Sequence, residues 1–174
     1  KTLTRMLCFD TYDIDGDGVN EHPTQALLDL YTMNEACGGL DGLNITLCGD
    51  LKHTRSTNSI ALGLAHYKVH IQFVSPDELR VTNPIKEVIE GVGQATYEEL
   101  DDIRKAVGDA DVVYITRVQK ERLANPDDYE KFSGSYQVNR EILDLSNKVI
   151  RVLHHLPRVG ELSEDVDDYP GAMY

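Results

Sequence analysis

Short apolar segments that resemble strands alternate with helix-forming segments along the chain, and this alternation constrains the fold more than any other feature. Successive parallel strands need a crossover connection, which is usually a helix packed on the sheet. The alternation therefore predicts an α/β fold: a doubly wound, mainly parallel, Rossmann-like sheet of about four to five strands with helices on both faces. A length of 174 residues suits one core, so we expect residues 1–174 to form a single domain.

Runs of β-branched and other apolar residues predict four strands. They are Leu43–Cys48, Val69–Val74, Asp111–Thr116 and Val149–Leu153. Apolar residues at helical spacing, together with capping signals, predict five helices. They are Pro23–Cys37, Thr57–Tyr67, Pro84–Gly91, Glu98–Val107 and Asn139–Asn147, the last with Asn139 as its N-cap. Leu7–Ile14 has no clear pattern, and Asp15–Asn20 should form a glycine-rich loop.

The charge balance of the chain argues against several kinds of partner. The 30 acidic and 17 basic residues leave a formal net charge of −13, whereas nucleic acids and anionic membranes bind basic surfaces. No apolar run approaches the roughly 20 residues that span a bilayer, and Lys1–Met6 lacks the apolar core of a secretory signal. Cys8, Cys37 and Cys48 have no CxxC spacing, so we expect a reducing, cytoplasmic compartment without structural disulfides or zinc.

Basic residues gather after two of the predicted strands, at the end of the sheet where parallel α/β folds bind ligands. Asp50–Thr57 carries a lysine, a histidine and Arg55 next to a helix start, whose free N–H groups favour an anion. In Thr116–Arg122, Arg117 can hold a carboxylate or phosphate with two parallel hydrogen bonds. Solvated loops with local ion pairs are the alternative for each segment taken alone. Together the segments predict a site for a small anionic substrate.

His154–Arg158 follows the fourth predicted strand and contains two adjacent histidines. Paired histidines can bind zinc, but neighbours in a strand point to opposite faces, and no cysteine or further histidine lies nearby in the sequence. We therefore expect no metal here. Pro157 could follow a cis peptide bond in a tight turn. This segment completes the set of strand ends at which we expect the anion.

Two features lie near the start of the chain. His22 precedes a helix, where the local field disfavours imidazolium, so a neutral ring could donate a hydrogen bond to a developing oxyanion. A simple capping histidine is the alternative. Asp13–Val19 matches the opening D-x-D-x-D-G of a calcium loop. Position twelve of that loop would be Thr24 rather than glutamate, and Pro23 precedes it, so we do not expect an EF-hand. A calcium-binding module is an alternative, which titration with calcium would test.

Four segments, in order and with similar spacing, resemble the carboxyl-terminal half of the aspartate carbamoyltransferase catalytic chain. The family's patterns read GDG-x-x-x-HPTQ-x-LLD, GDLK-x-x-R, TR-x-QKER and HPLPR. The corresponding segments here are Gly16–Asp29 (GDGVNEHPTQALLD), Gly49–Arg55 (GDLKHTR), Thr116–Arg122 (TRVQKER) and His154–Arg158 (HHLPR). The resemblance runs from about Ile14 to Tyr174, while residues 1–13 match poorly. It identifies the chain as similar to the family's L-aspartate-binding domain.

The resemblance implies a transferase reaction that belongs to pyrimidine biosynthesis. The amine of L-aspartate attacks the carbonyl carbon of carbamoyl phosphate, and a tetrahedral intermediate then releases phosphate. The resemblance implies no cofactor and no metal, because positioning and electrostatics carry the catalysis. It also implies a homotrimer in the complete enzyme, with or without regulatory chains. Its partners would be the two small anionic substrates.

The resemblance also assigns site residues by their positions in the four segments. His22, Arg55 and Arg117 take catalytic positions, with His22 bonded to the carbonyl oxygen. Arg55 and Arg117 bind the carboxylates of aspartate, and Gln119 lies beside them. The residues implied for carbamoyl phosphate are His22, Gln25, Leu156 and Pro157, the last two through their backbone.

Departures from the family pattern leave other interpretations open. The family's amino-terminal, carbamoyl-phosphate-binding half, with its S-T-R-T segment, has no counterpart in these residues. Thr54 and His155 stand where glycine and proline are usual. A truncated, non-catalytic homologue that acts as a binding or regulatory module is therefore one alternative. A relative of ornithine carbamoyltransferase is another, although two arginines suit a substrate with two carboxylates.

Overall fold

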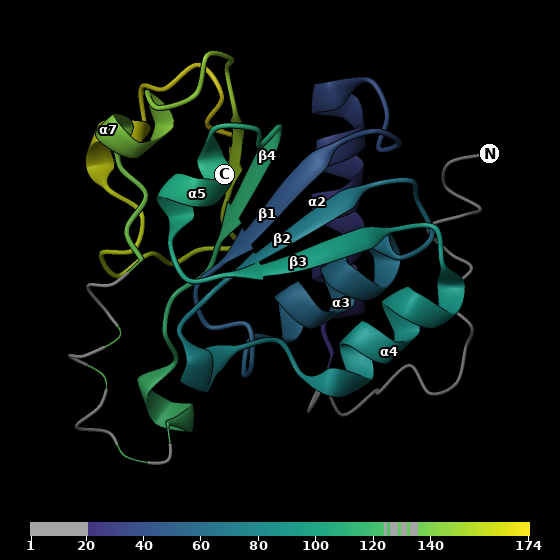
Figure 1. Cartoon of the computed structure of the whole chain (residues 1–174). Coiled ribbons are helices and arrows are strands. Elements are labelled where there is room, and N and C mark those ends of the chain that lie inside the picture. The colour runs from purple at the N-terminus through teal and green to yellow at the C-terminus, as the bar shows by residue number, and fades with distance from the viewer. Residues whose placement is uncertain (1–20, 124, 126–128, 130–131, 133–135) are drawn as a thin grey trace.

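The computed structural model describes residues 21–174, except for residues 124, 126–128, 130–131 and 133–135. The segments Leu7–Ile14, Asp15–Asn20 and Asp13–Val19 considered above lie outside the described residues. Within the described part, five parallel strands form one sheet with helices on both faces (Figure 1). The predicted α/β class and the doubly wound parallel sheet are confirmed.

The strands follow the order β3-β2-β1-β4-β5 across the sheet. Their bounds are β1 Asn44–Cys48, β2 His70–Val74, β3 Thr96–Leu100, β4 Val112–Ile115 and β5 Arg151–Leu153. The central strand β1 pairs with β2 on one side and with β4 on the other. The chain winds outward in one direction from β1 to β3 and then returns to β4. This reversal places a switch point between β1 and β4, where loops diverge and leave room for a ligand.

Helices cover the two faces of the sheet unequally (Figure 1). One face carries α2 (Pro23–Cys37), α3 (Arg55–Leu64) and α4 (Asn83–Val92). The other carries the short helices α5 (Ile103–Val107) and α7 (Arg140–Leu143). Single 3-10 turns occur at Asp77–Leu79, Lys120–Arg122 and Glu164–Val166. None of these described helices is long and apolar enough to cross a bilayer.

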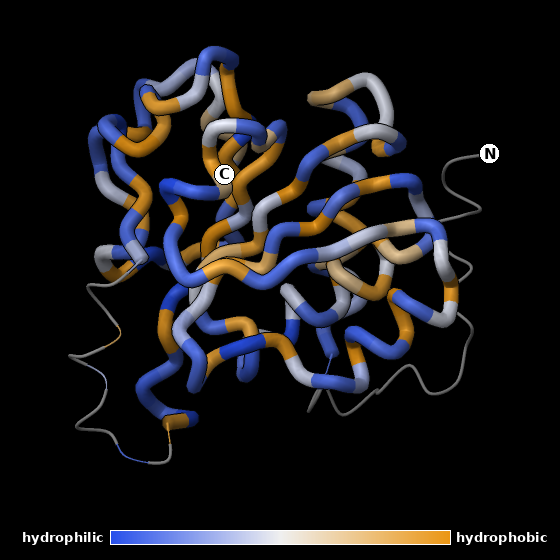
Figure 2. The backbone as a smooth tube through the Cα atoms, viewed as in Figure 1, coloured by the Kyte–Doolittle hydropathy of each residue, from blue (hydrophilic) through white to orange (hydrophobic). Residues whose placement is uncertain are grey.

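Each face of the sheet has its own hydrophobic core, because neighbouring residues of a strand point to opposite faces. Ile45 and Leu47 of β1 pack with α2, α3 and α4, together with Tyr114 of β4. Val113 and Ile115 of β4 pack on the other face with α5 and α7. Figure 2 shows hydrophobic residues recurring along the strands and on the inner turns of the helices. The two cores fix the strand ends from both sides.

The prediction of one helix over Glu98–Val107 is wrong. Residues 98–100 belong to β3, and α5 begins only at Ile103, where Asp102 accepts a hydrogen bond from the backbone N–H of Arg104 at 2.9 Å. β3 is an edge strand of exposed and half-buried residues, so it lacks the apolar signature of the inner strands. Glu98 is held by Gln72 of β2, whose amide donates to it at 3.0 Å.

The helix predicted at Pro23–Cys37 is present with those bounds, and the remaining predicted elements are present with shifted ends. Asn139 is the N-cap predicted for its helix and accepts from the N–H of Ile142 at 2.9 Å, but that helix ends at Leu143. The helix predicted to start at Thr57 begins at Arg55 instead. This shift matters for the site, because it places the side chain of Arg55 in the first turn of α3.

Candidate functional site at the carboxyl ends of the strands

A cavity of about 440 Å³ lies where the loops after β1, β4 and β5 meet the start of α2. Every site residue predicted from the sequence lines it: His22, Gln25, Arg55, Arg117, Gln119, Leu156 and Pro157. Its remaining lining residues are Thr54, Ser56, Glu121, Arg122 and His155. Four segments that are far apart in the sequence therefore meet around one volume. This volume can hold a small polar ligand.

The start of α2 orients the ring of His22. Nδ1 of His22 accepts a hydrogen bond from the backbone N–H of Gln25 at 3.3 Å, so the ring acts as the N-cap. The backbone N–H of His22 donates to Oγ of Ser59 at 2.9 Å, which ties α2 to α3. Because Nδ1 accepts, a neutral His22 ring carries its proton on Nε2. The capping role and a hydrogen bond to an oxyanion thus use different nitrogens of the same ring.

The loop after β1 divides its basic residues between two cavities. Arg55 lines the main cavity and also a neighbouring one of about 320 Å³. Lys52 and His53 line only the neighbouring cavity, so they do not join the other predicted site residues. Arg122 lines both cavities and donates from a guanidinium nitrogen to the carbonyl oxygen of His53 at 3.3 Å.

The carboxylate of Asp50 fastens the loop after β1 to the loop after β4. Asp50 is fully buried, and its Oδ1 accepts from the backbone N–H of His53 at 3.0 Å. Its Oδ2 accepts from the backbone N–H of Gln119 at 3.2 Å. Two loops that carry the two predicted arginines are therefore joined through one side chain. Asp50 was not among the predicted site residues, although its place two residues after a strand was a signal.

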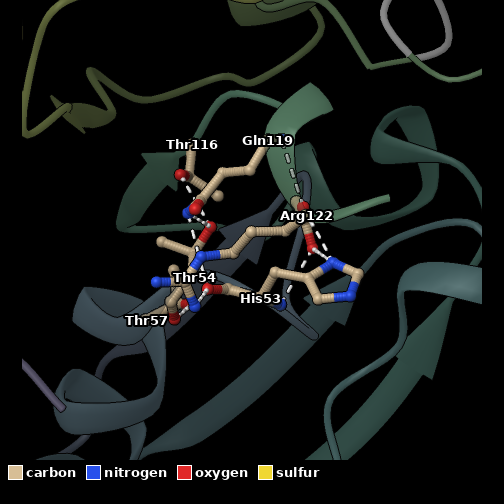
Figure 3. Close-up of polar contacts among 7 residues, drawn as sticks. His53, Thr54, Thr57, Thr116, Gln119 and Arg122 are labelled. Atoms are coloured by element: carbon tan, nitrogen blue, oxygen red, sulfur yellow. Dashed lines mark hydrogen bonds and ion pairs between the residues drawn. The ribbon is translucent and has the colours of Figure 1, made fainter. Parts of the chain in front are cut away.

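Side-chain contacts extend this junction toward the cavity (Figure 3). The amide of Gln119 donates to Oγ1 of Thr54 at 3.1 Å, and the hydroxyls of Thr54 and Thr116 lie 3.3 Å apart. Thr57 donates to the carbonyl oxygen of Thr54 at 2.7 Å. The side chain of Thr54, which stands where the family usually has glycine, is therefore accommodated by polar contacts with Gln119 and Thr116.

Arg117 projects from the loop after β4 and forms a two-pronged ion pair with Glu121. The hydrogen bond with Glu121 raises the pKa of Arg117 and lowers that of Glu121, so the pair stays charged. The side chain of Arg117 is 31% exposed, which leaves it accessible from the cavity. The local ion pair proposed as an alternative from the sequence is present, and it coexists with a place in the cavity wall.

The two histidines after β5 do not point to opposite faces, so that expectation is wrong. Both follow the last residue of β5, and their rings stack with centroids 5.3 Å apart. His154 is buried and its Nε2 lies 2.8 Å from Glu161, while its Nδ1 accepts from the backbone N–H of Leu156 at 2.7 Å. The peptide bond between Leu156 and Pro157 is cis, as considered from the sequence.

Electrostatics distinguish the buried groups behind the cavity. Burial, followed by the neighbouring charge of His154, lowers the pKa of His155 to about 4, so its ring is neutral near pH 7. Burial opposes the ionisation of Glu161, but the hydrogen bond from His154 and backbone donors outweigh it and hold its pKa below the usual range. Among the described residues, no group of three or more His, Cys, Asp or Glu side chains lies close enough together to hold a metal ion.

Comparisons with known proteins show the family of the chain. The family model "Aspartate/ornithine carbamoyltransferase, Asp/Orn binding domain" matches residues 41–174. The aspartate carbamoyltransferase catalytic subunit of Leptospira biflexa is 51% identical over 159 residues, which cover 91% of this chain and 51% of that protein. The catalytic subunit from Thermococcus kodakarensis is 45% identical over the same number of residues. The chain thus spans about half the length of the curated relatives it matches.

Solved structures with the same fold come from the same enzyme. The catalytic subunit of M. jannaschii aspartate transcarbamoylase is 43% identical with a TM-score of 0.82, over 91% of this chain and 51% of that one. The Trypanosoma cruzi enzyme in complex with carbamoyl phosphate and aspartate is 33% identical with a TM-score of 0.81, over 90% of this chain and 52% of that one. The family model and these likenesses lead to one conclusion: this chain belongs to the aspartate/ornithine carbamoyltransferase family.

Proposed function

We propose that residues 1–174 form the aspartate-binding half of an aspartate carbamoyltransferase. The enzyme would transfer the carbamoyl group from carbamoyl phosphate to the amine of L-aspartate, in the cytoplasm. The observation that carries this proposal is the convergence of seven residues, selected by their sequence motifs alone, on one cavity at the carboxyl ends of the strands. The complete enzyme would need a second half for the phosphate, and we propose a homotrimer for it.

His22 is the proposed partner of the carbonyl oxygen of carbamoyl phosphate. When the aspartate amine attacks, a C–N bond forms and negative charge grows on that oxygen, until the C–O bond to phosphate breaks and the electrons leave with phosphate. A neutral His22 carries its proton on Nε2, because Nδ1 accepts from the backbone N–H of Gln25. A fixed donor of this kind stabilises the intermediate more than the substrate and so speeds the reaction.

The proposed site for the carbamoyl amino group consists of acceptors. Gln25, Leu156 and Pro157 line the cavity, and the proposed acceptors are the amide oxygen of Gln25 and the backbone carbonyl oxygens of the other two. Each can accept one N–H of the amino group. The cis peptide bond turns the backbone here, and the N–H of Leu156 is already bound to His154. The segment can therefore offer carbonyl oxygens without competing N–H donors from Leu156.

Arg55 and Arg117 are the proposed ligands of the two aspartate carboxylates, with Gln119 beside them. They come from different loops, which Asp50 holds together. Arg117 would exchange Glu121 for a substrate carboxylate of the same geometry. Two guanidinium groups in one cavity favour aspartate over ornithine, whose side chain ends in an ammonium group and would be repelled.

Binding of a bisubstrate analogue that joins a phosphonate to aspartate tests the two arginines. Arg55→Ala and Arg117→Ala should each weaken the binding by roughly 1.5–3 kcal/mol, because each removes charge-assisted hydrogen bonds. Arg104→Ala is the matched control, since Arg104 lies on α5, is 61% exposed and does not line the cavity. Isothermal titration calorimetry gives the affinities. Unchanged affinity in both cavity variants would refute the assignment of Arg55 and Arg117.

A chimera separates an enzymatic role from a purely binding one. The matching 159 residues of this chain would replace their counterpart in the Leptospira biflexa catalytic subunit, which supplies the other half. Formation of carbamoyl aspartate by this chimera is the expected result. A folded chimera that binds the analogue but transfers no carbamoyl group would instead support the non-catalytic alternative.

A further inference from the structure

We infer that Asp29 is a positioning residue, which fixes the amide of Gln25 with its oxygen toward the cavity and thereby favours carbamoyl phosphate over acyl phosphates that lack an amino group. This inference rests on the proposed function, because it deepens the role of Gln25. It assigns a task to a buried carboxylate that no step of the proposed reaction uses.

The geometry leaves the amide of Gln25 a single orientation. Asp29 lies one turn after Gln25 in α2, and its Oδ1 accepts a hydrogen bond from Nε2 of Gln25 at 3.0 Å. An ionised carboxylate can only accept hydrogen bonds, so the edge of the amide that faces it must be the NH2 group. The amide oxygen of Gln25 is therefore turned away from Asp29. Because Gln25 lines the cavity, that oxygen is the acceptor it offers to a ligand.

Asp29 is poorly suited to a purely structural task. It is 5% exposed, and its Oδ2 has no hydrogen-bond partner of good geometry among the described residues, although the nearby hydroxyl of Tyr114 lowers its pKa. Burial raises its pKa to about 6, which shows that the surroundings oppose its charge. An apolar residue of similar size would fill the position at lower free energy. The contact that distinguishes aspartate here is the one with Gln25, on the cavity side.

Tyr114, which lies close to Asp29, and His155, which lies close to Tyr114, are polar but uncharged near pH 7. Burial raises the pKa of Tyr114 far above its usual value, and the pKa of His155 is lowered to about 4. The hydroxyl of Tyr114 lies 3.1 Å from Nδ1 of His155. His22 and His154 act on Asp29 only through their more distant charge, and no described cation forms an ion pair with it. The amide of Gln25 therefore has no cationic competitor for the carboxylate.

An acceptor fixed in this way discriminates by chemistry. Carbamoyl phosphate presents an amino group, and acetyl phosphate presents a methyl group in the same place, while both carry the same carbonyl and phosphate groups. The oxygen of Gln25 can accept from the amino group but gains nothing from a methyl group, and its own desolvation is then uncompensated. Contacts made by His22 and by the phosphate site are common to both ligands. A freely rotating amide could offer NH2 instead and would lose this preference.

Steady-state kinetics of the chimera described above test the inference. Asp29→Ala should lower kcat/KM for carbamoyl phosphate about fivefold to tenfold, as expected for one hydrogen bond, and change the inhibition constant of acetyl phosphate less than about twofold. Asp29→Asn should recover most of the loss, since its oxygen can still accept from Gln25. Glu35→Ala is the control, because Glu35 is an exposed acid on the same helix that does not line the cavity, and it should leave the ratio of the two constants unchanged.

A double-mutant cycle shows whether Asp29 acts through Gln25. Gln25→Met removes the amide, so adding Asp29→Ala to this variant should lower kcat/KM no further. The inference would be overturned if the two substitutions lowered kcat/KM additively. It would also be overturned if Asp29→Ala weakened the use of carbamoyl phosphate and the binding of acetyl phosphate by the same factor. Should Asp29→Ala fail to fold, Asp29→Leu in both backgrounds gives the same comparison. A wild-type chimera without carbamoyl transfer would instead count against the proposed function, so the two failures are distinguishable.

In the 174-residue chain itself, the side-chain NH2 signals of Gln25 in an ¹H–¹⁵N spectrum report the orientation directly. They should shift and exchange faster with solvent in Asp29→Ala and stay close to the wild-type positions in Asp29→Asn. Identical signals in the wild type and Asp29→Ala would contradict the positioning role, whatever the kinetics show.

Discussion

At the residue scale, a buried carboxylate makes stability depend on pH in an unusual direction. The pKa of Asp29 is raised from 3.8 to about 6 by burial, against the hydrogen bonds of Gln25 and Tyr114 and the charges of His22 and His154. The folded chain therefore binds this proton more tightly than the unfolded chain. The stability contributed by protonated Asp29 is fully present below about pH 4 and is lost as the pH rises through about 6.

Asp29→Asn should remove this dependence. The difference between pKa values of 3.8 and about 6 corresponds to about 3 kcal/mol, so the variant should gain up to that much unfolding free energy, relative to the wild type, between about pH 4 and pH 7. Urea denaturation of both proteins across this range measures the gain. Parallel curves for the wild type and the variant would show that folding does not raise the pKa of Asp29.

Individual site residues differ in how far the sequence could predict them. Arg55 and Arg117 were predictable, because a basic residue after a strand of an acidic chain stands out and falls in a motif. Asp29 ends another motif but was given no role, because an aspartate in an amphipathic helix usually faces solvent and its burial depends on packing against the sheet. His155 was predicted to point away from His154, but the chain has already left the strand there.

At the scale of elements, the site depends on how closely the loop after β4 approaches the end of β1. Gly49 follows β1 with a φ of 115°, and a Cβ atom at this residue would lie 2.1 Å from the carbonyl oxygen of Thr116. The backbone N–H of Thr116 donates to the carbonyl oxygen of Cys48 at 2.9 Å. Glycine is therefore required here both for its conformation and for its lack of a side chain.

Gly49→Ala should destabilise the chain by at least about 2 kcal/mol, because it combines a strained φ with a clash against backbone. Gly91→Ala is the matched control, since Gly91 lies inside α4 and a Cβ atom there meets nothing within 4 Å. That change should raise stability by about 0.5–1 kcal/mol. Denaturation curves of the two variants give the comparison. Similar effects from both substitutions would contradict the role given to Gly49.

The elements themselves were predictable where burial was complete. β1 and β4 are buried along nearly their whole length, and their apolar runs stand out in the sequence. β3 was missed because an edge strand has one partner and exposed charges, so its sequence resembles a helix surface. The junction made by Asp50 could not be predicted, because a hydrogen bond to the backbone of Gln119 needs the two loops already placed side by side.

At the scale of the whole molecule, the site concentrates positive charge in a chain with a net charge of −13. Arg55, Arg117 and Arg122 all line one cavity, and of these Arg117 also pairs with Glu121 in the same wall. Such a focus favours anionic ligands locally although the chain as a whole repels them. The parallel sheet makes this possible, because it brings loops from distant parts of the sequence to one end.

The two edges of the sheet are protected by different means. β3 presents exposed and half-buried residues at one edge, including Glu98 and Glu99, and charges of this kind oppose pairing with another chain. The other edge, β5, is covered by the last residues of the chain. The N–H of Val152 donates to the carbonyl oxygen of Gly171 at 2.8 Å, and the N–H of Met173 donates to that of Val152 at 2.9 Å.

Met173→Pro should uncover part of the β5 edge, because proline lacks the N–H that bonds to Val152. The loss of this hydrogen bond, with a buried carbonyl group left unsatisfied, should lower the unfolding free energy by about 1–3 kcal/mol and promote self-association. Met173→Ala keeps the N–H and removes only a 38% exposed side chain, so it should change stability much less. Denaturation and sedimentation velocity measure the two effects. Equal losses of stability in Met173→Pro and Met173→Ala would show that the backbone hydrogen bond of Met173 does not protect the β5 edge.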